Sequence, residues 1–101
     1  KGIVEAYLER QLPDNWDSMD LYQRRDFLAD ELNPKGTTPR DYVCVAEIWC
    51  ECLGRNREDM DRYRTREIND LLKIMPEWEP CKASKRFPIY GKQKYYVRKI
   101  D

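Results

Sequence analysis

The stretch from Thr65 to Lys99 constrains the fold most, because it reads as a helix followed directly by a basic, aromatic hairpin. Four apolar residues recur at i, i+3, i+4 and i+7 and share one helix face: Ile68, Leu71, Leu72 and Met75. Thr65 is the predicted N-cap, since its hydroxyl can accept a backbone N–H of the first turn. Pro76 lacks an N–H and clashes with the preceding turn, so the helix is predicted to end near Met75.

The residues after Pro76 predict two strands, near Glu77–Lys82 and Gln93–Lys99, with Gly91 as the bend between them. A third short strand is expected at residues 42–45, because two strands alone are marginal in water. A helix that leads straight into a positively charged hairpin is the layout of a winged helix-turn-helix. The expected fold is therefore mainly α with a small antiparallel sheet, winged helix-turn-helix-like with an extra N-terminal helix.

Two further helices are predicted in the first third of the chain. The first spans roughly residues 2–10, and the second runs roughly from Ser18 to Asp30, capped by Asp17 or Ser18. One face of the second helix is predicted to carry Leu21, Tyr22, Arg25 and Leu28. Trp16, in the turn between the helices, is expected to anchor that turn to the domain. Residues 31–40 contain two prolines, a glycine and two threonines and are predicted to form a loop.

The clearest amphipathic pattern belongs to a helix predicted over residues 45–53. Its apolar positions are Val45, Ile48, Trp49, Cys52 and Leu53. The pattern predicts that this helix is the buried one, and Gly54 is its expected left-handed C-cap. Glu47 and Glu51, one turn apart, are interpreted as its solvated side. The polar connector at 56–63 is predicted to hold one helical turn, with Met60 and Tyr63 facing inward.

A chain of 101 residues is one small domain. We divide it into an N-terminal helical part, residues 1–30, and a helix-turn-helix plus wing, residues 40–101. Because the chain begins with Lys, we expect it to be a fragment excised from a longer protein. With 38% charged residues it has no apolar run long enough for a membrane span, and its first ten residues do not form a signal peptide. A cytoplasmic location is predicted.

The four cysteines and the absence of histidine restrict the chemistry. No C-x₂-C pair occurs, which disfavours a zinc site, and we expect four reduced thiols with Cys44 and Cys52 as small core hydrophobes. Without histidine, general-base and nucleophile pairings would need Asp, Glu, Lys or Cys alone. No glycine-rich phosphate loop is found either. The sequence predicts a non-enzymatic chain with no catalytic residue, no metal and no cofactor.

The charges are distributed unevenly, although the net charge is zero. Residues 1–34 carry four basic and eight acidic side chains, residues 35–80 carry eight and ten, and residues 81–101 carry seven and one. One basic pole is the electrostatic footprint of a phosphate-binding surface. A charged face that only contacts solvent is the other interpretation.

Two groups of residues are candidates for nucleic-acid binding. On the helix, Arg66, Asn69, Asp70 and Lys73 are expected to face outward, where Arg and Asn match guanine and adenine edges. Arg62 and Arg64 precede them and are expected to contact phosphates. Glu67 and Asp70 lie on the same segment and would repel the DNA backbone. An ordinary exposed helix face explains these residues about as well.

The second group lies in the hairpin. Its members are Lys85, Arg86, Tyr90, Lys92, Gln93 and Lys94. Amine and guanidinium groups bind phosphates with release of counterions, while a tyrosine at the tip can stack on a base. The alternative is that the aromatic side chains simply fix the hairpin to the helices.

Several segments resemble the C-terminal region of the virulence-associated protein E family. They are N-W-D-S-M-D-L-Y-Q-R-R at 15–25, E-I-W-C-E-C-L-G at 47–54, R-E-I-N-D-L-L at 66–72, R-F-P-I-Y-G-K-Q at 86–93 and Y-V-R at 96–98. The resemblance implies a bacteriophage or mobile-island protein with an upstream P-loop, helicase-like ATPase and sometimes a primase region. The family's nucleotide-binding and catalytic residues have no counterpart in this chain.

Together these features predict a non-catalytic accessory domain of a replication ATPase. Its expected partners are DNA, duplex or forked, and the upstream ATPase domain, with no membrane and no metal. The alternative is a protein-interaction or oligomerisation domain that docks on the ATPase or on a host partner. The acidic first third favours that alternative, as do four aromatic residues of the kind enriched at interfaces: Trp16, Tyr22, Tyr42 and Trp78.

Overall fold

The structure, a computed structural model, describes residues 2–30 and 36–99. Its α-helices are α1 (Ile3–Glu9), α2 (Leu21–Ala29), α3 (Val45–Glu47) and α4 (Arg62–Lys73), and its strands are β1 (Tyr42–Val43), β2 (Trp78–Phe87) and β3 (Gly91–Arg98). Short 3₁₀ turns η1 (Trp16–Ser18) and η3 (Arg57–Asp59) precede α2 and α4. A π-helical segment, η2 (Ile48–Cys52), continues α3. The prediction of helices with a small antiparallel sheet is confirmed.

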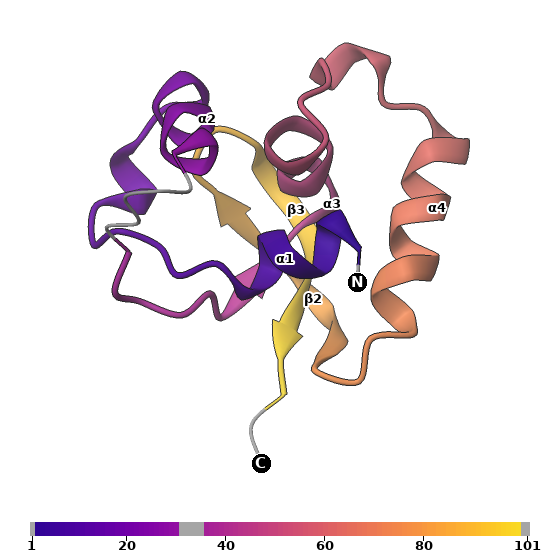
Figure 1. Cartoon of the computed structure of the whole chain (residues 1–101). Coiled ribbons are helices and arrows are strands. Elements are labelled where there is room, and N and C mark those ends of the chain that lie inside the picture. Colours follow the sequence, from indigo (N-terminus) through magenta and orange to yellow (C-terminus); the bar gives the residue numbers. More distant parts are fainter. Residues whose placement is uncertain (1, 31–35, 100–101) are drawn as a thin grey trace.

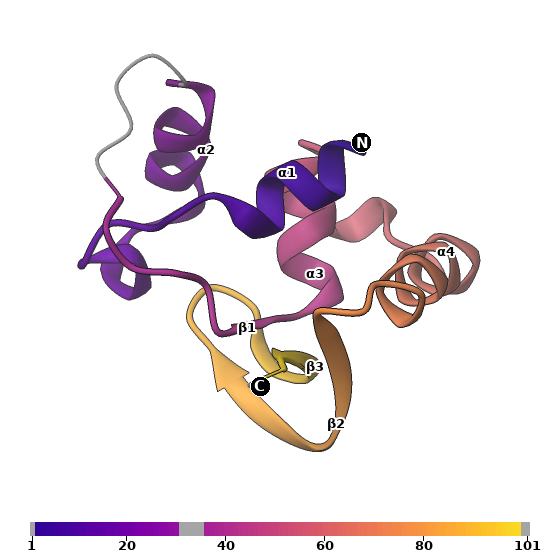
Figure 2. The ribbon, with the colours of Figure 1, turned by 60° about the horizontal axis from the view of Figure 1, so that its bottom comes forward.

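The three strands form one antiparallel sheet in the order β1-β3-β2. The helices lie on one side of the hairpin formed by β2 and β3, and no described helix covers its other side (Figures 1 and 2). The core between helices and sheet includes Val43, Ile48, Leu72 and Tyr96. The short strand predicted near residues 42–45 thus exists, paired with β3 through Tyr42↔Val97 and Val43↔Tyr96.

The N-terminal helices form close to their predicted positions, but the cap of α2 differs. Asp20 is the N-cap: its Oδ1 accepts the Gln23 N–H at 2.8 Å, and Gln23 Oε1 accepts the Asp20 N–H at 2.9 Å. This reciprocal capping box satisfies two backbone donors, so the prediction of Asp17 or Ser18 as cap is wrong. Tyr22 is 81% exposed, and the buried residue of α2 is Arg24. Of the predicted loop at 31–40, residues 31–35 lie outside the described residues.

The helix predicted at 45–53 is buried, as expected, but on more of its surface than the pattern indicated. Ile48 and Trp49 are 0% and 3% exposed, and Cys50, which is not among the predicted apolar positions, is 1% exposed. Cys44 is fully buried and Cys52 is half-buried against the core. The Leu53 N–H bonds the Ile48 carbonyl, five residues back, at 3.0 Å. Gly54, with φ of 65°, ends the helix in the left-handed conformation, as predicted.

The helix predicted from Thr65 begins earlier. Asp61 is its N-cap, with Oδ1 accepting the Arg64 N–H at 2.8 Å, whereas Thr65 lies within the helix and donates its hydroxyl to the Asp61 carbonyl. The predicted apolar face is confirmed, with Ile68, Leu71, Leu72 and Met75 buried or packed against the core. Met60 also packs there, but Tyr63 is 69% exposed, so its predicted inward orientation is wrong.

The hairpin is longer than predicted. Its strands extend to Phe87 and Gly91, which pair with each other, so the turn holds only residues 88–90. The basic residues expected in a loop therefore lie on paired strands. Ile89 and Gly91 both have φ of 77°, and Gly91 allows the reversal without a Cβ in that conformation. No described helix is long and apolar enough to cross a membrane.

Candidate nucleic-acid interface

One face of the hairpin carries three exposed cations. Arg86 pairs with Lys92 and Ser84 pairs with Lys94, and cross-strand partners in an antiparallel sheet lie on the same face. Side chains two residues apart on a strand also share a face, which places Arg86, Lys92 and Lys94 together. All three are exposed. We call Arg86, Lys92 and Lys94 the hairpin cations.

The hairpin cations have no ion-pair partner among the residues that the structure describes. Arg86 and Lys92 are directly opposite each other, an arrangement in which like charges destabilise a sheet. The described ion pairs instead involve Arg24, Arg40 and Arg98. Within the described part of the chain, this face therefore carries three positive charges that no carboxylate neutralises.

Two other predicted hairpin residues lie away from that face. Lys85 pairs with Gln93, one position along each strand from Arg86 and Lys92, so both side chains lie on the other face of the sheet. The Lys85 ammonium lies 3.9 Å from the centroid of the Tyr42 ring, and the Gln93 side-chain amide donates to the Tyr90 carbonyl at 3.0 Å. The predicted cluster is thus divided between two faces by the alternation of the strands.

On α4, four of the five predicted residues form one stripe. Arg62, Arg66, Asn69 and Lys73 fall at i, i+4, i+7 and i+11, which align on a helix. Arg64 lies on a different side. The three basic residues of the stripe are exposed, and Asn69 is half-buried.

A hydrogen bond joins this stripe to the hairpin. Tyr96 donates its hydroxyl to Asn69 Oδ1 at 2.9 Å, and Tyr96 is two residues from Lys94 on the same strand face. The stripe of α4 and the face with the hairpin cations therefore meet at this bond. Asn69 is engaged in it rather than turned fully outward as predicted. Burial, together with the nearby charge of Asp70, raises the pKa of Tyr96 above its usual value, which keeps the hydroxyl protonated as a donor.

Tyr90 is the clearest correction to the predicted site. The sequence interpretation placed its ring at a free tip, but the residue is 6% exposed. Its hydroxyl donates to Glu51 Oε2 at 2.6 Å, and the Arg57 guanidinium lies over its ring at 5.8 Å. Its burial and the adjacent carboxylate of Glu51 raise its pKa well above the usual value. Tyr90 fixes the tip of the hairpin to η2 and offers no stacking surface.

The carboxylates of Glu47 and Glu51 form a buried polar network that the sequence interpretation missed. Both residues were assigned to a solvated side, but they are 4% and 6% exposed. Glu51 accepts from Tyr7 at 2.8 Å and from Arg24 at 2.8 Å, in addition to Tyr90. Glu47 lies 3.4 Å from Arg24 and 3.7 Å from Arg40 and accepts the Cys44 N–H.

This network connects α1, α2, the segment before β1, the buried helix and the hairpin tip. Arg24 also donates to the Trp16 carbonyl at 3.0 Å, and its guanidinium lies 4.5 Å from the centroid of a Trp16 ring. Trp16 therefore anchors the turn before α2 to the domain, as predicted. Burial raises the pKa of Glu47 to about 7, although the positive charge of Arg40 acts to lower it. Removing one partner of a buried ion pair typically costs 3–5 kcal/mol. The network is therefore a structural support that holds the basic hairpin in place.

Within residues 2–30 and 36–99, no three His, Cys, Asp or Glu side chains are grouped as metal ligands. Neither a protein-family model nor a curated protein matches the sequence. The resemblance to the virulence-associated protein E family stays a prediction from the sequence. So does the prediction that the chain is not an enzyme and binds no cofactor.

Proposed function

We propose that this chain is a non-catalytic, nucleic-acid-binding domain that contacts DNA through the hairpin cations and the basic stripe of α4. The observation that supports it most is the cross-strand pair of Arg86 and Lys92, two like charges without a described carboxylate partner. Such a pair reduces the stability of the hairpin when free. A phosphate between the two side chains would convert the repulsion into two favourable contacts.

The order of elements supports a winged helix-turn-helix arrangement as part of this proposal. Strand β1 is followed by the buried helix, then by α4, then by the hairpin of β2 and β3, with β3 at the centre of the sheet. In this arrangement α4 is the recognition helix and the hairpin is the wing. The polar connector and η3 separate the buried helix from α4, a longer spacing than the three or four residues of a simple helix-turn-helix.

The wider role remains a proposal based on the sequence resemblance. Under it, the domain is a DNA-binding accessory to an upstream P-loop ATPase encoded by a phage or mobile element and acts in the cytoplasm. The domain would increase the residence of the ATPase on duplex or forked DNA through charge contacts that need no catalytic residue.

The test is a fluorescence-anisotropy titration of labelled duplex and forked DNA at several salt concentrations. Replacing Arg86, Lys92 and Lys94 together by Glu is expected to abolish binding. If about six phosphates are contacted by the unaltered chain, the log–log slope of affinity against salt is expected to be about −5. Arg64→Glu is the matched control, because Arg64 is exposed on another side of α4, and it is expected to retain most of the affinity.

The second candidate function is docking on another protein. Two exposed apolar side chains of the N-terminal helices favour it, since Ile3 is 65% and Tyr22 is 81% exposed. Under this alternative, the triple Glu variant binds its partner normally, whereas Ile3→Asp and Tyr22→Asp do not. An unaltered chain that binds no DNA at low salt would refute the nucleic-acid proposal.

A further inference from the structure

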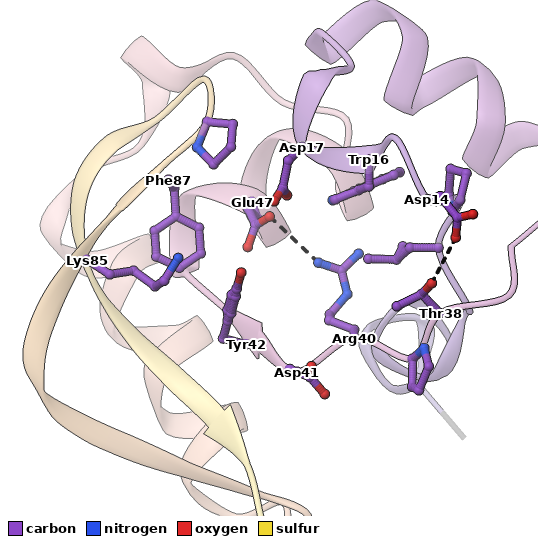
Figure 3. A pocket seen from close by; sticks show the side chains of 14 residues that line it. Asp14, Trp16, Asp17, Thr38, Arg40, Asp41, Tyr42, Glu47, Lys85 and Phe87 are labelled. Atoms are coloured by element: carbon purple, nitrogen blue, oxygen red, sulfur yellow. Dashed lines mark hydrogen bonds and ion pairs between the residues drawn. The ribbon is translucent and has the colours of Figure 1, made fainter.

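We propose that a pocket beside the hairpin accepts a single unstacked nucleobase, so that the domain prefers single-stranded or forked DNA over blunt duplex. This inference rests on the proposed nucleic-acid-binding function and deepens it. The pocket has a volume of about 160 Å³ and lies between the N-terminal segment, the residues before β1, and the hairpin tip (Figure 3). By the same measure one water needs about 10–15 Å³, so the pocket has room for a ring-sized group.

The pocket has an aromatic wall. Tyr42, Phe87 and Trp16 line it, and the Tyr42 ring is seen nearly edge-on in Figure 3 with Lys85 on one side and the pocket with Arg40 on the other. Because the Lys85 ammonium covers one face of the ring at 3.9 Å, the opposite face is the one left for a planar ligand. Stacking on an aromatic side chain is the usual means of holding an unpaired base.

Buried donors in the pocket lack acceptors. Arg40 is 2% exposed, and its guanidinium carbon lies 4.3 Å from the centroid of the Tyr7 ring. Its Nη1 is directed to Glu47, but its Nε and Nη2, like Nε1 of Trp16, have no hydrogen-bond partner within the described part of the chain. Buried donors without acceptors are costly. An acceptor atom on a ligand ring is the kind of partner that these donors lack.

The charges of the lining favour a base over a phosphate. Four carboxylates contribute to it, and they would repel an anion: Asp14, Asp17, Asp41 and Glu47. The same carboxylates accept hydrogen bonds, whereas Arg40 and Trp16 donate them, so the lining matches a neutral ring whose edge carries both donors and acceptors. Lys85 belongs to both the pocket and β2. A base in the pocket would therefore leave its phosphate beside Lys85, on the face of the hairpin opposite the hairpin cations.

The inference is tested by anisotropy titrations with a labelled single-stranded oligonucleotide and the corresponding blunt duplex. Tyr42→Ala removes the stacking wall and is expected to weaken single-strand binding about tenfold, the loss of one base–aromatic stack, with little change for the duplex. Tyr95→Ala is the matched control. Tyr95 packs against Tyr42 at 6.3 Å between ring centroids on the same sheet but does not line the pocket. Tyr42→Phe, which keeps the ring, is expected to bind as the unaltered chain does.

An NMR titration supplies a second readout. Adding a free nucleoside to the full chain is expected to shift the indole N–H signal of Trp16 and to leave that of Trp49, whose Nε1 donates to the Asn56 carbonyl at 2.6 Å, unchanged. The inference is overturned if Trp16 does not respond, or if Tyr42→Ala affects single strands and duplex equally. If neither nucleic acid binds the unaltered chain, the proposed function fails, and the nucleoside titration still decides whether the pocket binds a base.

Discussion

The hydroxyl of Tyr90 donates to Oε2 of Glu51 at 2.6 Å, although the two residues are 39 positions apart in the sequence. The same carboxylate oxygen accepts from Arg24 at 2.8 Å, so the hairpin tip and the second helix share one acceptor on the buried helix. Charge-assisted bonds of this length are stronger than bonds between neutral groups. The position of the basic hairpin is therefore set by a buried carboxylate and not by the turn residues alone.

Replacing Tyr90 by Phe should lower the free energy of unfolding by roughly 1.5–3 kcal/mol, the usual value of a hydrogen bond to a charged group. The ring remains, and Glu51 keeps its contact with Arg24. Urea denaturation followed by circular dichroism measures the change. The control is Tyr95→Phe, which removes a hydroxyl from a half-buried ring of the sheet and is expected to have a smaller effect. Equal losses in the two variants would contradict the assigned role of Tyr90.

Arg98 and Arg86 should respond differently to truncation, although both are arginines of the hairpin. Arg98 donates to the carbonyls of Arg40 at 2.8 Å and Leu8 at 3.0 Å and pairs with Glu9 at 3.3 Å. Arg98→Ala is expected to destabilise the fold by roughly 2–3 kcal/mol, whereas Arg86→Ala is expected to stay within about 0.5 kcal/mol. Thermal or urea unfolding measures stability. In a DNA titration, Arg86→Ala should weaken binding more than Arg98→Ala does. Equal losses of stability for Arg98→Ala and Arg86→Ala would refute the different roles assigned to the two residues.

Asp61 should be the residue on which the first turn of α4 depends. Asp61→Ala is expected to lower stability by about 1 kcal/mol, because the Arg64 N–H loses its acceptor. Thr65→Ala removes only a side-chain bond to a backbone carbonyl and is expected to cost less. The two variants are compared by urea denaturation. A larger loss for Thr65→Ala would restore Thr65 as the cap.

Glu47 should make stability depend on pH. Burial raises its pKa from an ordinary 4.5 to about 7, so between these values the folded chain holds a proton that the unfolded chain has released. The contribution of Glu47 to stability is therefore full below about pH 4.5, falls as the pH rises toward 7 and changes little above that. Glu47→Gln mimics the protonated side chain and should remove this slope.

The measurement for Glu47 is the free energy of unfolding of both proteins from pH 5 to pH 8. The difference between them isolates Glu47 from the other titrating groups. Stability of the Glu47→Gln variant relative to the unaltered chain should rise with pH and level off near pH 7. A difference that does not change over this range would mean that Glu47 keeps an ordinary pKa in the folded chain.

The sequence was sufficient for the elements whose signal is local. The face of Ile68, Leu72 and Met75 and the left-handed Gly54 were recoverable, because each depends on residues close together in the chain. The third strand was predicted because two strands alone are marginal in water, although its partner β3 lies far along the chain. The cap of α4 was misplaced by a few positions, since both Asp61 and Thr65 precede the apolar pattern and either can cap a helix. The ends of β2 and β3 nearest the turn were also misplaced, because a segment rich in lysine and arginine has the composition of a loop even where its backbone is paired in a strand.

The buried network was not recoverable by the same reasoning. Glu47 and Glu51 have helical spacing and no local sign of burial, and their partners Arg24 and Arg40 come from segments before β1. Only the tertiary packing of α1 and α2 against the buried helix removes these carboxylates from water. The position of Tyr90 was missed for the same reason, since its acceptor belongs to a distant helix.

The pairing of β2 with β3 contains one irregularity, and its position determines where the hairpin can bend. Trp78 to Pro80 pair with β3 at one end and Ser84 to Phe87 at the other, while the register shifts between Pro80 and Ser84. With the tip bonded to Glu51 and the base paired through β3 to β1, bending of the hairpin must concentrate at residues 81–83. Amide hydrogens there should exchange with solvent sooner than those of the neighbouring strand residues.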